Sequence, residues 1–175
     1  APSLSTSTTT FAVSVTRGIV YGQGAVNGGA GSEDLLLDLY APQDTGQAVL
    51  PLVVVVHGGG FVGGSRSQSN VAGWSNEFAS RGYLVASIDY RLMGDDPLPS
   101  ERVGAVYDQV MSSGGDAQQV AAVAAMDDTL TALDHLLARP DVDKNSTTLV
   151  GGSAGAVTVD NVAYLLDDFG VSRPP

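Results

Sequence analysis

Three short runs of branched apolar residues divide the chain, and each is long enough for one β-strand. They cover residues 51–57, 83–90 and 147–151. A continuous apolar run is typical of a strand that is buried on both faces, whereas a half-exposed strand alternates apolar and polar residues. We therefore expect these segments to be parallel strands in the interior of one sheet.

The segment that precedes these runs has the alternating pattern instead. Apolar and polar residues alternate over residues 11–16, and a glycine-rich turn near Gly28 leads into a second strand-like segment at residues 34–40. Two such segments joined by a glycine turn are typical of an antiparallel hairpin. We expect this hairpin to span residues 11–40.

Three further segments have the pattern of helices. They cover residues 70–81, residues 116–139, and the stretch from just after Ser153 to about Leu166. Gly82 and Pro140 supply the stops of the first two helices. The second helix carries its large apolar residues on one stripe, which favours packing against a sheet: Val120, Val123, Leu130, Leu133 and Leu137.

Alternation of strands and helices indicates an α/β fold with a mixed, mostly parallel sheet that is flanked by helices. Residues 93–116 fit neither pattern well, because their periodicity is weak and both ends are polar and rich in glycine. We interpret this stretch as an insertion that passes over the edge of the sheet.

Composition narrows the class of protein. The chain has 175 residues, of which 43% are hydrophobic and 15% are charged, as expected of a sequence that forms a core. No apolar run approaches the roughly 18 residues of a membrane span. With 8 basic against 19 acidic residues the net charge is -11, which argues against nucleic acid or anionic lipid as a partner.

The absence of cysteine excludes a disulfide framework, a thiolate metal site and a cysteine nucleophile. The sequence begins at Ala1 and continues with a polar run over residues 3–10, as a mature chain does after removal of a signal peptide. We therefore expect a secreted or periplasmic protein. An edited sequence would begin in the same way, so both origins stay open.

Glycine is the compositional anomaly, with 22 residues that gather beside the apolar runs. One cluster, Gly151-Gly152-Ser153-Ala154-Gly155, lies where a strand is expected to end and a helix to begin. A nucleophilic serine needs such a sharp turn, and it needs small residues two positions before and after it, because the strand and the helix pass in contact there. Ser153 is therefore the candidate nucleophile. The alternative is a glycine-rich turn that serves only packing.

A second cluster completes this pattern. His57-Gly58-Gly59-Gly60-Phe61 follows a buried strand and offers backbone N–H groups that no Cβ blocks. We expect the N–H groups of Gly59, Gly60 and Ala154 to form an oxyanion hole for acyl transfer. Both clusters follow parallel strands, and ligands bind at the carboxyl ends of such strands in α/β sheets.

These motifs together resemble the α/β-hydrolase esterases and lipases of the HGGG type. The resemblance rests on motifs in the family's order: residues 38–42 (DLYAP), 57–65 (HGGGFVGGS), 89–92 (DYRL) and 140–157 (PDVDKNSTTLVGGSAGAV). The HGGGF motif is similar to the carboxylesterase and cholinesterase branch, whereas DYRL is more like the hormone-sensitive-lipase branch. Gly152 replaces the acidic residue that both branches usually carry before the serine.

The resemblance implies that residues 1–175 are the amino-terminal part of one α/β-hydrolase domain. In that reading an oxyanion loop covers residues 57–65, an insertion covers residues 93–116, and the nucleophile elbow covers residues 151–155. It further implies that His57, with Gly58 after it, orders the oxyanion loop.

The same resemblance implies a triad of serine, carboxylate and histidine in that order, which this sequence does not supply. Its two histidines, His57 and His135, both precede Ser153. His135 is expected to be structural, because it lies where the family often carries a packed aromatic residue. The carboxylates that follow Ser153 all lie on or near the last helix: Asp160, Asp167 and Asp168.

The leading hypothesis is a serine carboxylic ester hydrolase that acts through an acyl-enzyme on a small-molecule ester. A second polypeptide, produced by cleavage near Pro175, would complete the sheet and carry the catalytic acid and histidine. The alternative is a non-catalytic relative that binds a ligand, such as a receptor or an adhesion protein.

No cofactor or metal is expected. The stretch 141–145 resembles the start of a calcium loop, but Ser146 and Gly152 stand where that loop needs glycine and glutamate. Gly22-Gln23-Gly24 lacks the third glycine of a dinucleotide site.

Overall fold

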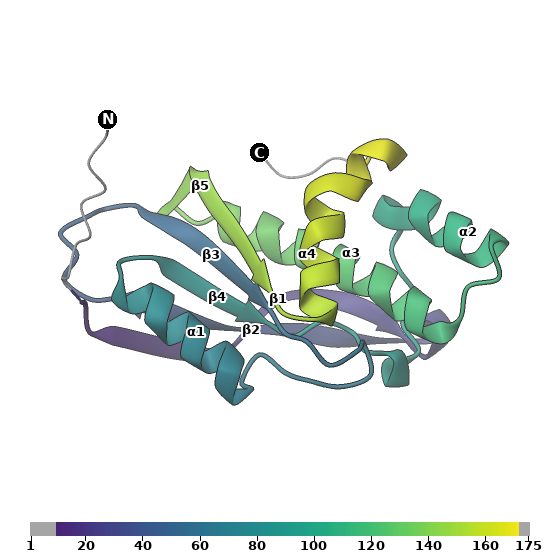
Figure 1. Ribbon diagram of the computed structural model, residues 1–175, viewed down its shortest axis with the longest axis horizontal. Helices are drawn as coiled ribbons and strands as arrows, with labels where there is room; N and C mark the ends of the chain where they lie inside the picture. The colour runs from purple at the N-terminus through teal and green to yellow at the C-terminus, as the bar shows by residue number, and fades with distance from the viewer. Residues whose placement is uncertain (1–9, 172–175) are drawn as a thin grey trace.

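The computed structural model describes residues 10–171, which form one mixed sheet with helices on both faces (Figure 1). The strands are β1 (Val13–Val26), β2 (Gly31–Pro42), β3 (Leu50–Val56), β4 (Leu84–Ile88) and β5 (Val142–Gly151). The helices are α1 (Ser69–Ser80), α2 (Gly104–Ser112), α3 (Ala117–Leu137) and α4 (Ala154–Tyr164). Short 3-10 turns are η1 (Asn27–Gly29), η2 (Met93–Asp95), η3 (Glu101–Val103) and η4 (Leu165–Phe169).

The strand order across the sheet is β1-β2-β4-β3-β5. β1 and β2 pair antiparallel, as do β2 and β4, whereas β4, β3 and β5 run parallel. β3 and β4 are interior strands, as their continuous apolar runs predict, whereas β5 pairs on one side only within residues 10–171. The mixed α/β sheet predicted from the sequence is confirmed.

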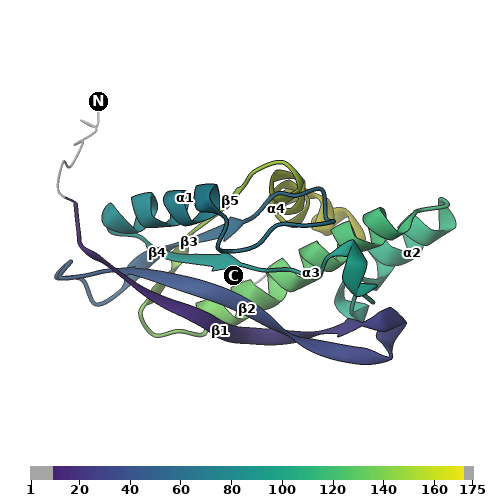
Figure 2. The ribbon, with the colours of Figure 1, turned by 90° about the horizontal axis from the view of Figure 1, so that it is seen from below.

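The two faces of the sheet are covered by different helices (Figure 2). Alternate residues of β3 divide between them, with Val53 and Val55 packed in the cluster on the α1 side and Val54 in the larger cluster on the α3 side. Leu130 of α3 is fully buried in that larger cluster. A strand with apolar side chains on both faces is stable only when both faces are covered, which explains its continuous apolar run.

The structure differs from the sequence prediction in the stretch 93–116, which contains the helix α2. Its apolar residues recur at helical spacing, with Val103 and Val106 buried and Tyr107 and Val110 packed against the core. The pattern covers only two turns, so it is short against the background of polar and glycine residues. No helix within the described residues is long and apolar enough to cross a membrane.

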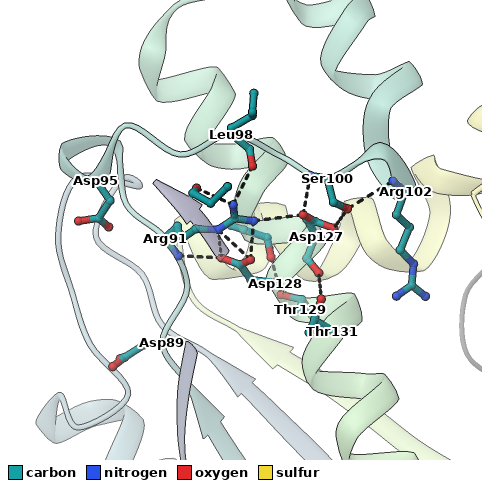
Figure 3. Close-up of polar contacts among 12 residues, drawn as sticks. Asp89, Arg91, Asp95, Leu98, Ser100, Arg102, Asp127, Asp128, Thr129 and Thr131 are labelled. Atoms are coloured by element: carbon teal, nitrogen blue, oxygen red, sulfur yellow. Dashed lines mark hydrogen bonds and ion pairs between the residues drawn. The ribbon is translucent and has the colours of Figure 1, made fainter. Parts of the chain in front are cut away.

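The stretch 93–116, which the sequence indicates to be an insertion and which is called the inserted stretch from here on, is held to the sheet through the buried side chain of Arg91, which follows β4 (Figure 3). Its guanidinium donates to Asp128 Oδ1 (2.7 Å from Nη2) and to Asp127 Oδ2 (3.1 Å), both on α3. It also donates to the carbonyl oxygens of Ala25 at 3.0 Å and Leu98 at 2.8 Å. One cation therefore joins β1, the inserted stretch and α3.

Other contacts complete this cluster. Ser100, in the inserted stretch, donates to Asp127 through its backbone N–H (2.9 Å) and its hydroxyl (2.7 Å). Gly24 of β1 leaves room for the guanidinium, because a Cβ there would lie 2.4 Å from Arg91 Nε. Burial raises the pKa of Asp128 to about 6, and the opposing effect of Arg91 only partly offsets it. The site is therefore costly to desolvate and needs its full set of hydrogen bonds.

Replacing Arg91 by methionine should lower the free energy of unfolding by about 3–5 kcal/mol, because two buried carboxylates lose their cation. The matched control is Arg81→Met, because Arg81 pairs with Glu77 on the exposed surface of α1. That pair should contribute less than about 1 kcal/mol. Urea unfolding of both variants measures the difference, and equal effects would contradict the role given to Arg91.

Candidate active site

Ser153 stands on a strained turn between β5 and α4. Its backbone angles are φ 55° and ψ -120°, outside the regions that residues with a Cβ favour. The side chain is exposed and does not cap α4, and its hydroxyl has no hydrogen-bond partner within residues 10–171. The turn thus presents a free hydroxyl at the carboxyl end of a parallel strand.

The glycines around Ser153 are required by contacts between backbones. A Cβ on Gly151 would lie 2.3 Å from the carbonyl of Gly155, and a Cβ on Gly155 would lie 2.2 Å from the carbonyl oxygen of Val56. The start of α4 therefore lies directly against the ends of β5 and β3. This is the close approach that the sequence pattern predicts.

The glycine loop after β3 lies beside the serine. A Cβ built on Gly58 would lie 2.7 Å from the carbonyl oxygen of Gly152 and 3.3 Å from Cβ of Ser153. The loop then turns through Gly59, Gly60 and Phe61, whose φ angles are 128°, 64° and 61°. Sequence reasoning placed the serine and this loop in one site, and the structure brings them together.

Three backbone N–H groups at this point have no partner within the described residues. They belong to Gly59, Gly60 and Ala154, the residues expected to form the oxyanion hole. Ala154 is the first residue of α4, where the helix geometry leaves N–H groups unpaired and the helix dipole is positive. Unpaired donors beside an exposed serine can stabilise a negative charge that develops on a substrate oxygen.

His57 lies at the base of the loop and is buried rather than available to the serine. Its ring stacks on Tyr90 with centroids 4.2 Å apart, and Tyr90 Oη donates to the carbonyl oxygen of His57 at 3.0 Å. Its Nδ1 lies 2.8 Å from the carbonyl oxygen of Gly58, so this nitrogen carries the proton. Burial lowers the pKa of His57, so the neutral ring is favoured.

The remaining titratable candidates lie away from Ser153. His135 is in the last turn of α3, whereas Gln118 in the first turn contacts the glycine loop. At about 1.5 Å per residue, some 25 Å of helix separate these two residues. Asp160 is on α4, and Asp167 and Asp168 are in η4. None of these carboxylates therefore lies in a loop directly after the carboxyl end of a strand. Residues 10–171 therefore contain no histidine placed to accept the serine proton.

A second ion-pair cluster fastens the far end of the glycine loop. Arg66 donates through Nε to Asp38 Oδ1 at 2.9 Å and forms an ion pair with Asp89. Asp38 is buried in β2 and also accepts from the backbone N–H of Gly18 at 2.9 Å. Burial raises the pKa of Asp38, but the bonds to Arg66 and Gly18 outweigh it, and the net shift is downward.

The sequence alone did not identify these anchoring carboxylates, because an acidic residue is usually found on a solvated surface. Asp38, Asp127 and Asp128 are buried and paired. The available signal was their position, since Asp38 lies in an apolar strand and the two others lie on the apolar side of a long helix. Within the described residues no group of three or more His, Asp or Glu side chains could hold a metal ion.

Trp74 of α1 occupies the space beside Gly152. A Cβ on Gly152 would lie 3.1 Å from the indole ring, which is tighter than ordinary van der Waals contact. Trp74 remains 39% exposed, so an aromatic surface borders the nucleophile turn. Glycine at position 152 fits beside this ring without displacing it.

The sequence and the structure are similar to those of known esterases. The family model described as BD-FAE matches residues 37–105. Gut esterase 1 of Caenorhabditis elegans is 29% identical over 133 residues, which are 76% of this chain and 21% of that protein.

Solved structures give the same result over most of this chain. Esterase B of Lactobacillus rhamnosis, inhibited by a tributyrin phosphonate, has a TM-score of 0.62 and 26% identity over 93% of this chain and 45% of its own. A brefeldin A esterase, a bacterial homologue of human hormone-sensitive lipase, has a TM-score of 0.60 and 17% identity. The match covers 97% of this chain and 40% of that esterase. The chain thus spans less than half of the length of each of these relatives.

Gly59→Ala should lower the free energy of unfolding by about 1–3 kcal/mol, because a Cβ there would lie 2.0 Å from the carbonyl oxygen of Gly63 and φ is 128°. Gly63→Ala, in the same loop, is the control, because no atom lies within 4 Å of its added Cβ and its φ is not positive. This control should change stability by less than about 0.5 kcal/mol. Urea unfolding of the two variants tests the geometry of the loop, and equal stabilities would contradict it.

Proposed function

From the α/β-hydrolase fold of this chain, we propose that the protein is a serine carboxylic ester hydrolase and that residues 1–175 carry its nucleophile. The observation that carries the proposal is the placement of an exposed, strained Ser153 beside a glycine loop with unpaired N–H groups. Strain at a serine with no packing role is typical of a nucleophile turn.

In the proposed reaction Ser153 Oγ attacks the ester carbonyl carbon while a base takes its proton. The carbonyl oxygen becomes an oxyanion, which accepts hydrogen bonds from the N–H groups of Gly59, Gly60 and Ala154. The bond to the alcohol oxygen then breaks, the alcohol leaves with a proton, and Ser153 holds the acyl group. Water attacks this acyl-enzyme, and the acid product leaves with Ser153 restored.

We propose that the base, a histidine, and its acidic partner come from a polypeptide segment outside this sequence. Support comes from the sheet, because the outer edge of β5 is unpaired within residues 10–171. A groove of about 530 Å³ lies along that edge. Its apolar lining comes from α3, β5 and α4: Leu133, Leu137, Leu149, Val159, Val162 and Tyr164. An unpaired strand beside an apolar groove suits the addition of further strands.

Cleavage near Pro175 stays a prediction from the sequence, and residues 172–175 lie outside the described residues. The same holds for residues 1–9, on which the proposal of a secreted or periplasmic location depends.

The proposed substrate is a small-molecule ester with a short acyl chain. It is supported by esterase B, a structural relative whose structure holds a C4 tributyrin phosphonate. No cofactor enters the proposed reaction, because acyl transfer needs only a nucleophile, a base and an oxyanion site.

A second candidate function is ligand binding without catalysis, as in a receptor built on the same fold. The observation in its favour is that, within residues 10–171, neither His57 nor His135 forms a hydrogen bond with Ser153. The retained strain at Ser153 and the three free N–H groups favour the hydrolase.

A fluorophosphonate should label Ser153 at one group per chain, because phosphonylation requires a base that activates the hydroxyl. Ser153→Ala should lower ester turnover by at least about 10³-fold. The control is Ser80→Ala, a serine on the exposed face of α1 that should retain full activity. Peptide mass spectrometry locates the label, and an unlabelled native protein would favour the receptor.

A denaturing mass spectrum of the active protein tests the missing segment. The expected result is a second polypeptide that contains histidine, or one chain heavier than the 17.8 kDa of this sequence. Ester hydrolysis by a sample that contains only the 17.8 kDa species would overturn the proposal that the base comes from elsewhere.

A further inference from the structure

Two consecutive carbonyl groups of the glycine loop accept hydrogen bonds, one from the first turn of α3 and one from Met93. The side chain of Gln118, in the first turn of α3, donates from Nε2 to the carbonyl oxygen of Gly60 at 2.7 Å. The backbone N–H of Met93 donates to the carbonyl oxygen of Phe61 at 2.8 Å. Gln118 is the only one of the two donors that a side-chain substitution can remove.

The loop needs such contacts because the backbone of one of its residues, Phe61, has a φ angle that is unfavourable for a residue with a Cβ. Gly59, Gly60 and Phe61 have positive φ angles in succession, and for Phe61 this conformation is strained. Within the loop, Gly59 accepts from the N–H groups of Val62 and Gly63, both at 3.2 Å. Rotation of the peptide unit between Gly60 and Phe61 would turn the Phe61 N–H and change ψ of Gly60, so it would disturb the path of the loop next to the Gly59 and Gly60 N–H groups.

Gln118 is carried by a rigid support. Asp116 and Gln119 form a reciprocal cap at the start of α3, with bonds of 2.9 Å and 3.0 Å. Further along α3, Asp127 and Asp128 hold the buried Arg91. The position of the Gln118 backbone is therefore set by contacts that do not involve the glycine loop.

We propose that Gln118 is a positioning residue that holds the oxyanion loop in its productive shape. The inference rests on the proposed hydrolase function, and it gives the first turn of α3 a role: it carries the side-chain donor that fixes one of the two loop carbonyls. Gln118 itself does not touch the reacting atoms. It acts by fixing the peptide unit between Gly60 and Phe61, and with it the path of the loop after Gly59 and Gly60.

The expected effect is moderate, because the hydrogen bond is exposed to solvent. A net hydrogen bond of ordinary strength corresponds to a change of roughly 2- to 12-fold. The loss should fall on kcat, because the oxyanion forms only in the transition state, and KM should stay within about twofold.

The experiment compares Gln118→Ala, Gln118→Glu and Gln118→Lys with Gln119→Ala in the active, complete protein. Alanine removes the donor, glutamate places a second acceptor against the Gly60 oxygen, and lysine restores a donor of similar reach. We expect lower kcat for alanine, lower still for glutamate, and recovery with lysine. Gln119→Ala should lower thermal stability slightly, because one of the two capping bonds is lost. It should leave kcat unchanged, because the Asp116 carboxylate still accepts from the backbone N–H of residue 119 and keeps the start of α3 in place.

Hydrogen exchange at the Val62 and Gly63 amides provides a readout that does not depend on ester turnover. Exchange should be faster in Gln118→Ala than in Gln119→Ala, because only the first loosens the loop. Equal kcat in Gln118→Ala and the wild type, no recovery with lysine, or equal exchange in the two alanine variants would overturn the proposal. Failure of the hydrolase assignment itself would appear as an unlabelled Ser153 in the wild type.

Discussion

The architecture around the site depends on one buried cation, the guanidinium of Arg91. It is 2% exposed, and its partners come from β1, from the inserted stretch and from α3. These segments are far apart in the sequence, and desolvated carboxylates are stable only while the guanidinium is present. Arg91 therefore requires the inserted stretch and the helix to adopt one arrangement, on which the support of the glycine loop is built.

The two residues before Arg91 contact the two ends of the glycine loop. Asp89 pairs with Arg66 at the end of the glycine loop, and Tyr90 stacks on His57 at its beginning. Three successive residues after β4 thus hold both ends of the glycine loop, the inserted stretch and α3. Contacts between backbones place Ser153 against the other side of the loop, because glycine at 155 lets α4 touch the end of β3. The residues after β4 therefore position the glycine loop, and the contact between Gly155 and the end of β3 positions Ser153 beside it.

Much of this could be predicted from the sequence, where a local pattern has one physical meaning. The apolar runs of β3 and β4 and the glycines around Ser153 are of this kind, because burial on both faces and backbone contact each demand a residue type. The pairing of Asp128 with Arg91 could not be predicted. An acidic residue on a helix has the same local pattern whether it is solvated or buried, and its partner lies 37 positions away.

The contact between Trp74 and Gly152 links two positions that are unrelated in sequence. A Cβ at position 152 would lie 3.1 Å from the indole, so a side chain there requires the ring to shift by a few tenths of an ångström. The ring is 39% exposed, and its position sets the aromatic surface beside the nucleophile turn. A change at position 152 therefore also changes that surface, and the two positions are best exchanged together when the mouth of the site is redesigned.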